Sequence, residues 1–189
     1  MSDLVSVIVP AYNAESRIRP CLESIASQDY GEIEIIAVDD ASTDRTGEIA
    51  REVLEGSGRK FTVITSERNS GECASRNTGL KYAAGKYVCF VDADDVIRPE
   101  FVSRLHDAAV RGECDIAFCG LTDRFTDGKP DKDIFPLSAG WGEELILSEA
   151  VPPVWCCIYD SGFLKRTGLL FHEGCSAGDR KSTRLNSSH

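Results

Sequence analysis

Short apolar segments alternate with longer amphipathic segments along the first two thirds of the chain. Segments 5–9, 33–38, 61–65, 86–91 and 115–119 have the length and apolar content of buried strands. Between them, segments 14–28, 43–54, 72–84 and 99–110 carry apolar residues at helical spacing. Strands that alternate with helices of about 10–15 residues predict β-α-β units. The expected fold class is therefore α/β, with a mainly parallel sheet flanked by helices.

The rest of the chain has a weaker pattern. Residues 122–142 are rich in Asp, Gly, Lys and Pro and predict a loop. Residues 143–174 are apolar and aromatic with weak periodicity, and we expect them to pack on the sheet. The last nine residues, 181–189, are polar and resemble a translated adapter tail, so we exclude them from the fold.

Composition and charge exclude several classes of protein. A chain of 189 residues with 42% hydrophobic content fits an ordinary globular domain. Its net charge of -10 argues against broad binding to nucleic acid or to anionic membranes. The apolar runs are too short to cross a bilayer, and we expect no targeting segment. The eight cysteines form no CxxC pair, which predicts buried free thiols, no zinc site and a cytoplasmic location.

Acidic residues follow two of the predicted strands. Asp39 and Asp40 follow the second strand, and Asp92, Asp94 and Asp95 follow the fourth. The ends of parallel strands meet at one sheet edge, where ligands bind, so we expect these five carboxylates to converge. Like charges in such proximity need a cation or hydrogen-bond donors to neutralise them, and Mg²⁺ or Mn²⁺ suits carboxylate oxygens. The alternative interpretation of Asp40, and more so of Asp44, is helix capping.

No glycine-rich phosphate loop is present. Neither GxGxxG nor GxxxxGK[ST] occurs, which disfavours dinucleotide-binding and P-loop chemistry. Phosphates would instead be bound through a metal ion and basic side chains. Arg68, Arg76 and Lys81 are the candidates, although the favoured interpretation of Arg68 and Lys81 is that they are solvated surface charges.

Four motifs together resemble the family 2 glycosyltransferases of GT-A fold. They are residues 5–13 (VSVIVPAYN), 38–44 (VDDASTD), 69–79 with NSG and ASRNTG, and 91–95 (VDADD). Residues 155–159 (WCCIY) and 170–174 (LFHEG) also resemble the segment that precedes the family's acceptor site. The resemblance divides the chain into a donor-binding domain, 1–120, a partial acceptor-side subdomain, 121–180, and the tail, 181–189.

The resemblance implies transfer of a sugar from a nucleotide sugar, often a UDP sugar, to a saccharide or lipid-linked hydroxyl, usually with inversion. Under it, Asp40 accepts the N–H of the base, Asp39 supports that loop, and Arg76 faces the diphosphate. Asp94 binds Mn²⁺ or Mg²⁺, Asp92 serves mainly the ribose or a metal-bound water, and Asp95 is the alternative ligand. The implied location is the cytoplasm, including the inner face of the membrane. The full donor-binding set is Pro10, Ala11, Tyr12, Glu15, Asp39, Asp40, Arg76, Asp92, Ala93 and Asp94.

The match to the family ends at the general base. The family draws this base from a Glu-Asp pair soon after the segment matched by 171–174, whereas residues 176–180 read SAGDR. Asp179 is the candidate, and Glu173 is a less favoured substitute. We therefore expect the chain to hold the donor half, to bind donor, and to transfer sugar poorly or not at all.

Two other functions fit parts of the pattern. A nucleotide-sugar-binding module without turnover would need no base, and turnover of a UDP sugar separates it from the enzyme. A phosphoryl-transfer or receiver-like protein would use clustered Asp residues and Mg²⁺, but it predicts a Lys on a late strand. Segment 115–119 has none.

Overall fold

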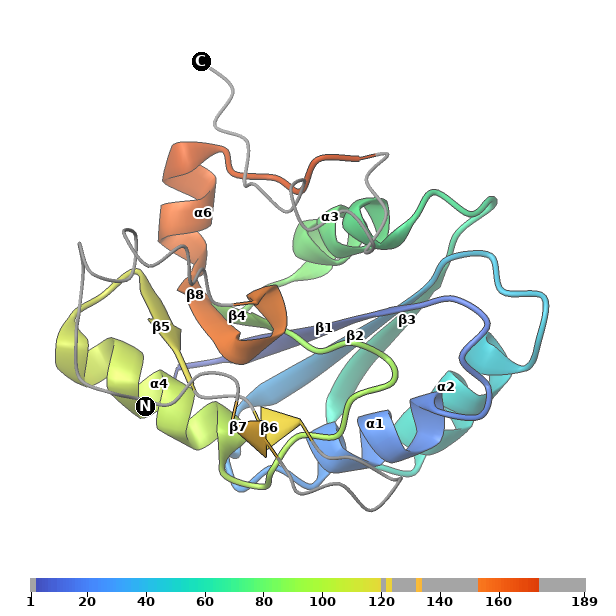
Figure 1. Cartoon of the computed structure of the whole chain (residues 1–189), viewed down its shortest axis with the longest axis horizontal. Coiled ribbons are helices and arrows are strands. Elements are labelled where there is room, and N and C mark those ends of the chain that lie inside the picture. The colour runs from blue at the N-terminus through green and yellow to red at the C-terminus, as the bar shows by residue number, and fades with distance from the viewer. Residues whose placement is uncertain (1–2, 120–121, 124–131, 134–152, 174–189) are drawn as a thin grey trace.

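The computed structural model describes residues 3–119, 122–123, 132–133 and 153–173. Six strands form one sheet in the order β3-β2-β1-β4-β8-β5 (Figure 1). They are β1 (Val5–Ala11), β2 (Ile33–Asp39), β3 (Lys60–Thr65), β4 (Tyr87–Phe90), β5 (Ile116–Phe118) and β8 (Cys157–Asp160). The helices are α1 (Ile18–Ala26), α2 (Thr46–Glu55), α3 (Glu72–Tyr82), α4 (Phe101–Gly112) and α6 (Ser161–Thr167). A 3-10 turn, η1 (Val154–Cys156), precedes β8, and β6 (Thr122–Asp123) pairs with β7 (Lys132–Asp133).

The predicted α/β architecture is confirmed, with all five predicted strands and all four predicted helices present. β1 pairs in parallel with β2 and β4, and β2 pairs in parallel with β3. Three helices begin later than predicted, among them α4, which begins at Phe101 and not at Pro99. α1 starts at Ile18 because residues 15–17 form a turn, and α2 starts at Thr46, whose backbone N–H donates to the Asp44 carboxylate (3.0 Å).

The sequence pattern missed α6 and the short β6–β7 pair, which lies in the predicted loop 122–142, and it missed one strand of the main sheet, β8. It lies between β4 and β5 and pairs antiparallel with both, through Val88 opposite Tyr159 and Ala117 opposite Ile158. Residues 143–174 were expected to pack on the sheet, and part of this segment is instead a strand within it. A four-residue strand that is buried on both faces has no alternating pattern, so periodicity could not reveal it.

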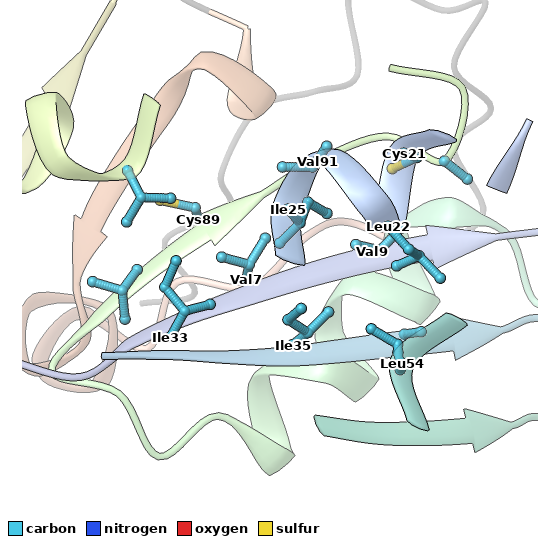
Figure 2. Packing of buried hydrophobic residues seen from close by; sticks show 14 of the residues in the cluster. Val7, Val9, Cys21, Leu22, Ile25, Ile33, Ile35, Leu54, Cys89 and Val91 are labelled. Carbon is cyan, nitrogen blue, oxygen red and sulfur yellow. The ribbon is translucent and has the colours of Figure 1, made fainter. Parts of the chain in front are cut away.

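Helices cover both faces of the sheet, which makes three layers. α1, α2 and α4 pack on one face against the apolar side chains of β1, β2 and β4. Figure 2 shows Val7 and Ile35 of the strands beside Ile25 of α1 in this core. α3 and α6 lie on the other face, where Ile8, Ile36 and Phe90 form a second cluster.

α3 lies unusually close to the sheet because Gly79 faces Ile8. A Cβ on Gly79 would collide with the Ile8 side chain, so only glycine allows this approach. Because α3 packs so closely, its residue Arg76 lies near the sheet and is buried.

The described cysteines form no disulfide and are buried or partly buried thiols, as predicted. Cys21, Cys73, Cys89, Cys156 and Cys157 are buried, and Cys114 and Cys119 are partly buried. Burial raises the pKa of the Cys21 thiol to about 12, which keeps it protonated at neutral pH.

Within the described ranges, no helix is long and apolar enough to span a bilayer.

A buried carboxylate ties three strands to the α3–β4 turn. Glu34, in β2, is 4% exposed and accepts from Ser6 Oγ (2.6 Å), Lys60 Nζ (2.7 Å) and the Ala84 N–H (2.7 Å). Burial alone would raise the pKa of Glu34, but these donors outweigh it and hold the pKa below its ordinary value.

Glu34→Gln should lower the free energy of unfolding at pH 7 by about 2 kcal/mol, because charge-assisted hydrogen bonds are lost in a buried site. The folded pKa of Glu34 lies below the unfolded value, so its contribution is fully present above the unfolded pKa. It is lost as the pH falls through the folded pKa. Urea unfolding should therefore separate wild type from variant at pH 7 and bring them together in acid. The exposed Glu32→Gln is the control, and a pH-independent difference would contradict the assignment.

Candidate functional site

The loops that follow β1, β2 and β4 meet at the carboxyl edge of the sheet. The loop after β1 and the loop after β2 are joined by hydrogen bonds from Asn13 N–H to Ser42 Oγ (3.0 Å) and from Thr43 N–H to Asn13 Oδ1 (2.9 Å). Glu15 extends this seam by accepting from the Arg45 N–H (3.1 Å). Asn13 and Ala41 have positive φ (47° and 58°), which for Ala41 is strained backbone held by these contacts.

Tyr12 and Glu15 are the exposed members of the four residues expected to line the nucleotide pocket, which also include Pro10 and Ala11. Pro10 and Ala11 are buried in the last part of β1, and the Ala11 carbonyl accepts from the Asp40 N–H (2.8 Å). The Tyr12 side chain that follows is 49% exposed. An aromatic ring left exposed at a ligand edge has a free face for stacking.

Asp39 and Asp40 are both bound by backbone N–H groups. Asp39 Oδ1 accepts from Ser42 N–H (3.0 Å). Asp40 is 3% exposed, and its carboxylate accepts from the N–H groups of Ser70 (3.1 Å) and Gly71 (2.7 Å), which lead into α3. Asp40 therefore anchors a loop in this structure, and its contact with a nucleotide base stays a prediction. Asp44 is a capping residue here, as the alternative interpretation held.

Arg76 lies beneath the site, buried between two carboxylates. It is 1% exposed and donates to Asp92 Oδ1 (2.8 Å) and to Glu72 Oε1. The Arg76 Nε has no hydrogen-bond partner among the residues that the structure describes. The guanidinium faces these acids, and its contact with a diphosphate stays a prediction.

Glu72 is a member of this cluster that the sequence analysis missed. Burial raises the pKa of Glu72, Arg76 opposes the rise, and the neighbouring charges of Asp92 and Asp94 add to it. One arginine thus serves two acids, so the cluster keeps excess negative charge.

Asp94 projects into solvent beside Arg17. Its side chain is 54% exposed, and Asp94 Oδ2 accepts from Arg17 at 3.0 Å. Arg17 lies just before α1 and no motif pointed to it. Between the two aspartates Ala93 is 8% exposed, and the Asp95 N–H closes a turn on the Asp92 carbonyl (3.0 Å).

The carboxylates at this edge supply part of the ligand set that a hard divalent cation needs. Over the described ranges, no three His, Cys, Asp or Glu side chains are gathered as a ready-made metal site. Magnesium-like ions, however, are held by one or two carboxylates together with substrate phosphates. Asp92 and Asp94, each with one oxygen that binds an arginine, can supply those two carboxylates.

The remaining candidates lie at the margins of the site. Arg68 and Lys81 are exposed, as the surface interpretation expects. Glu173 is exposed and accepts from Asn77 Nδ2 (3.2 Å). Asp179 lies outside the described residues, as does most of 121–180.

Comparisons with known proteins bear on the family and the fold of this chain. Residues 6–166 match the model of the family described as Glycosyl transferase family 2. The chain belongs to this family. Glycosyltransferase GlyA of Streptococcus pneumoniae is 44% identical over 117 residues, which are 62% of this chain and 16% of GlyA. WfgD of Escherichia coli, named a UDP-Glc:alpha-D-GlcNAc-diphosphoundecaprenol beta-1,3-glucosyltransferase, is 41% identical over 93 residues, 49% of this chain and 36% of WfgD.

Solved structures of known proteins share the fold of this chain. The crystal structure of S. aureus TarS 1-349 in complex with UDP-GlcNAc superposes with a TM-score of 0.78 at 31% identity, covering 95% of this chain and 52% of TarS 1-349. The GT-A fold expected from the sequence is therefore confirmed. The chain spans about half of TarS 1-349 and a smaller part of the curated relatives.

Asp40→Asn should lower the free energy of unfolding by about 1–2 kcal/mol, since the neutral amide keeps one acceptor oxygen and loses the charge that strengthens the bonds from the Ser70 and Gly71 N–H groups. The loss should appear without any nucleotide, because the anchored loop belongs to the fold. Urea denaturation of the ligand-free protein measures it, with the exposed Asp29→Asn as the matched control. Equal stability of the Asp40 and Asp29 variants would contradict the loop-anchoring role.

Proposed function

We propose that this chain is the donor-binding part of an inverting, metal-dependent glycosyltransferase that uses a UDP sugar. The observation that carries the proposal is the meeting of Tyr12, Asp40, Asp92 and Asp94 at the carboxyl edge of a fold shared with TarS. TarS is 31% identical to this chain and was crystallised with UDP-GlcNAc. We further propose that residues 1–120 bind the donor and that residues 121–180 belong to the acceptor side.

The roles of the side chains follow from their exposure and partners. Tyr12 offers an exposed ring on which the uracil can stack. Asp40 Oδ1 and Oδ2 have acceptor capacity beyond the two backbone N–H groups, which allows one of them to accept from the base. Asp92 is held in one orientation by Arg76, and Asp94 exchanges Arg17 for the ligand.

Asp92 and Asp94 would hold a divalent cation between the protein and the donor diphosphate. When bound, Mn²⁺ or Mg²⁺ supplies positive charge beside the departing diphosphate. Arg17 is close enough to Asp94 to add to that positive charge once it is released. Asp92 is oriented by the buried Arg76 before the donor arrives, so this carboxylate requires little rearrangement during transfer.

The acceptor is proposed to be a saccharide or lipid-linked hydroxyl. WfgD, a relative at 41% identity, is named for transfer to a GlcNAc-diphosphoundecaprenol. We propose that the chain works in the cytoplasm, including the inner face of the membrane, where a lipid-linked acceptor would be anchored.

Calorimetric titration with UDP, with and without Mn²⁺, tests the proposal. We expect Mn²⁺ to strengthen UDP binding, and Asp94→Asn to weaken binding in Mn²⁺ roughly tenfold, the equivalent of about 1.4 kcal/mol. Binding of UDP without Mn²⁺ should change little in the variant.

Asp29→Asn is the control, because it removes an exposed carboxylate elsewhere on the chain. A folded wild-type chain that does not bind UDP would contradict the donor assignment. Binding that ignores both Mn²⁺ and Asp94→Asn would contradict the metal assignment alone.

A further inference from the structure

The ring of Phe171 covers the buried arginine of the site. The Arg76 guanidinium carbon lies 5.3 Å from the centroid of the Phe171 ring, within the range of a cation–π contact. The ring also meets Phe90 of β4 edge-on, with centroids 5.0 Å apart and planes at 81°. Phe171 therefore sits against both the sheet and the charge that orients Asp92.

Asn77 fixes Phe171 in this place. Asn77 is 4% exposed, and its side-chain amide donates to the Phe171 carbonyl (2.9 Å) and accepts from the Phe171 N–H (2.9 Å). A side-chain amide thus pairs with both backbone groups of one residue, as a neighbouring strand would. Arg76 and Asn77 are adjacent in α3, so one helix turn holds both Asp92 and Phe171.

The aromatic cover changes the electrostatics of the Arg76–Asp92 pair. The Arg76 Nε has no hydrogen-bond partner within the described ranges, and Asp92 shares the guanidinium with Glu72. The negative face of the ring stabilises the cation without competing for its N–H groups. By excluding water, the ring also lowers the local dielectric constant and strengthens the attraction to Asp92.

We propose that Phe171 is a positioning residue for Asp92, which it orients by covering Arg76, and that Asn77 sets the position of Phe171. The inference rests on the proposed function, since it assigns Asp92 to the donor site. It also means that a segment 79 positions after Asp92 in the chain, within the acceptor-side part, controls donor affinity.

Phe171→Leu tests the role of the aromatic face, because leucine keeps an apolar side chain and removes the ring. We expect UDP binding in Mn²⁺, measured by calorimetry, to weaken roughly tenfold, as for the loss of a desolvated cation–π contact. Phe171→Tyr keeps the ring face and should restore most of the affinity.

Phe163→Leu is the matched control. Phe163, in α6, is a partly buried aromatic residue that packs against the same apolar cluster as Phe171. The Phe163→Leu variant should lose about as much thermal stability as Phe171→Leu but keep the wild-type affinity for UDP in Mn²⁺. Asn77→Ser removes the two hydrogen bonds to the Phe171 backbone and leaves the ring, so it should also weaken UDP binding. This variant tests the positioning role if Phe171→Leu does not fold.

The outcomes separate this inference from the proposed function. If wild type binds UDP and Phe171→Leu binds equally well, or if both Phe→Leu variants weaken binding alike, the positioning role is wrong. Failure of Phe171→Tyr to restore affinity overturns it as well. If the folded wild type does not bind UDP, the proposed function is wrong, and this inference falls with it.

Discussion

The buried charge of Arg76 is the constraint on which the site depends. A guanidinium that is 1% exposed must be compensated by nearby acids, since an unpaired buried charge costs several kcal/mol. α3 must therefore lie low enough for Arg76 to reach Asp92, and the contact of Gly79 with Ile8 permits this. The same helix then presents Asn77 to Phe171. The packing of α3 on the sheet therefore also determines the position of the Asp92 carboxylate.

The acidic edge of the sheet is stabilised one carboxylate at a time. Asp40 uses two backbone N–H groups, Asp92 uses a buried arginine, and Asp94 uses an exposed one. These partners differ in how readily they can be exchanged. The backbone groups and Arg76 are fixed by the fold, whereas an exposed ion pair is worth little and breaks easily. Asp94 is therefore the acid best suited to change partners when a ligand arrives.

The sequence was sufficient for most of the architecture and for placing acidic residues at the ends of strands. Periodicity revealed the β-α-β order, and acids such as Asp40 and Asp92 drew attention because they follow strands. It did not reveal that Arg76 is buried, because exposure is decided by how closely α3 approaches β1. Nor could it pair Asn77 with Phe171, since 94 residues separate them and a hydrogen bond between them leaves no periodic signal. Contacts between distant segments are set by tertiary packing, which a single sequence does not display.

β8 gives the sheet a particular order of completion. β5 is joined to the rest of the sheet through β8, and β8 begins at Cys157, well after β5 in the chain. The edge of β4 therefore stays unpaired until most of the chain has been synthesised. A nascent chain that has reached β5 presents unpaired backbone groups along the segment Tyr87–Cys89 of β4, and such an edge can pair with strands of other molecules. Closing the gap also requires contacts between segments far apart in sequence, which slows folding. Until β8 pairs with this edge, strands of other molecules can compete for it, so the topology favours aggregation during folding. Chaperones that shield exposed strand edges would reduce this competition during synthesis.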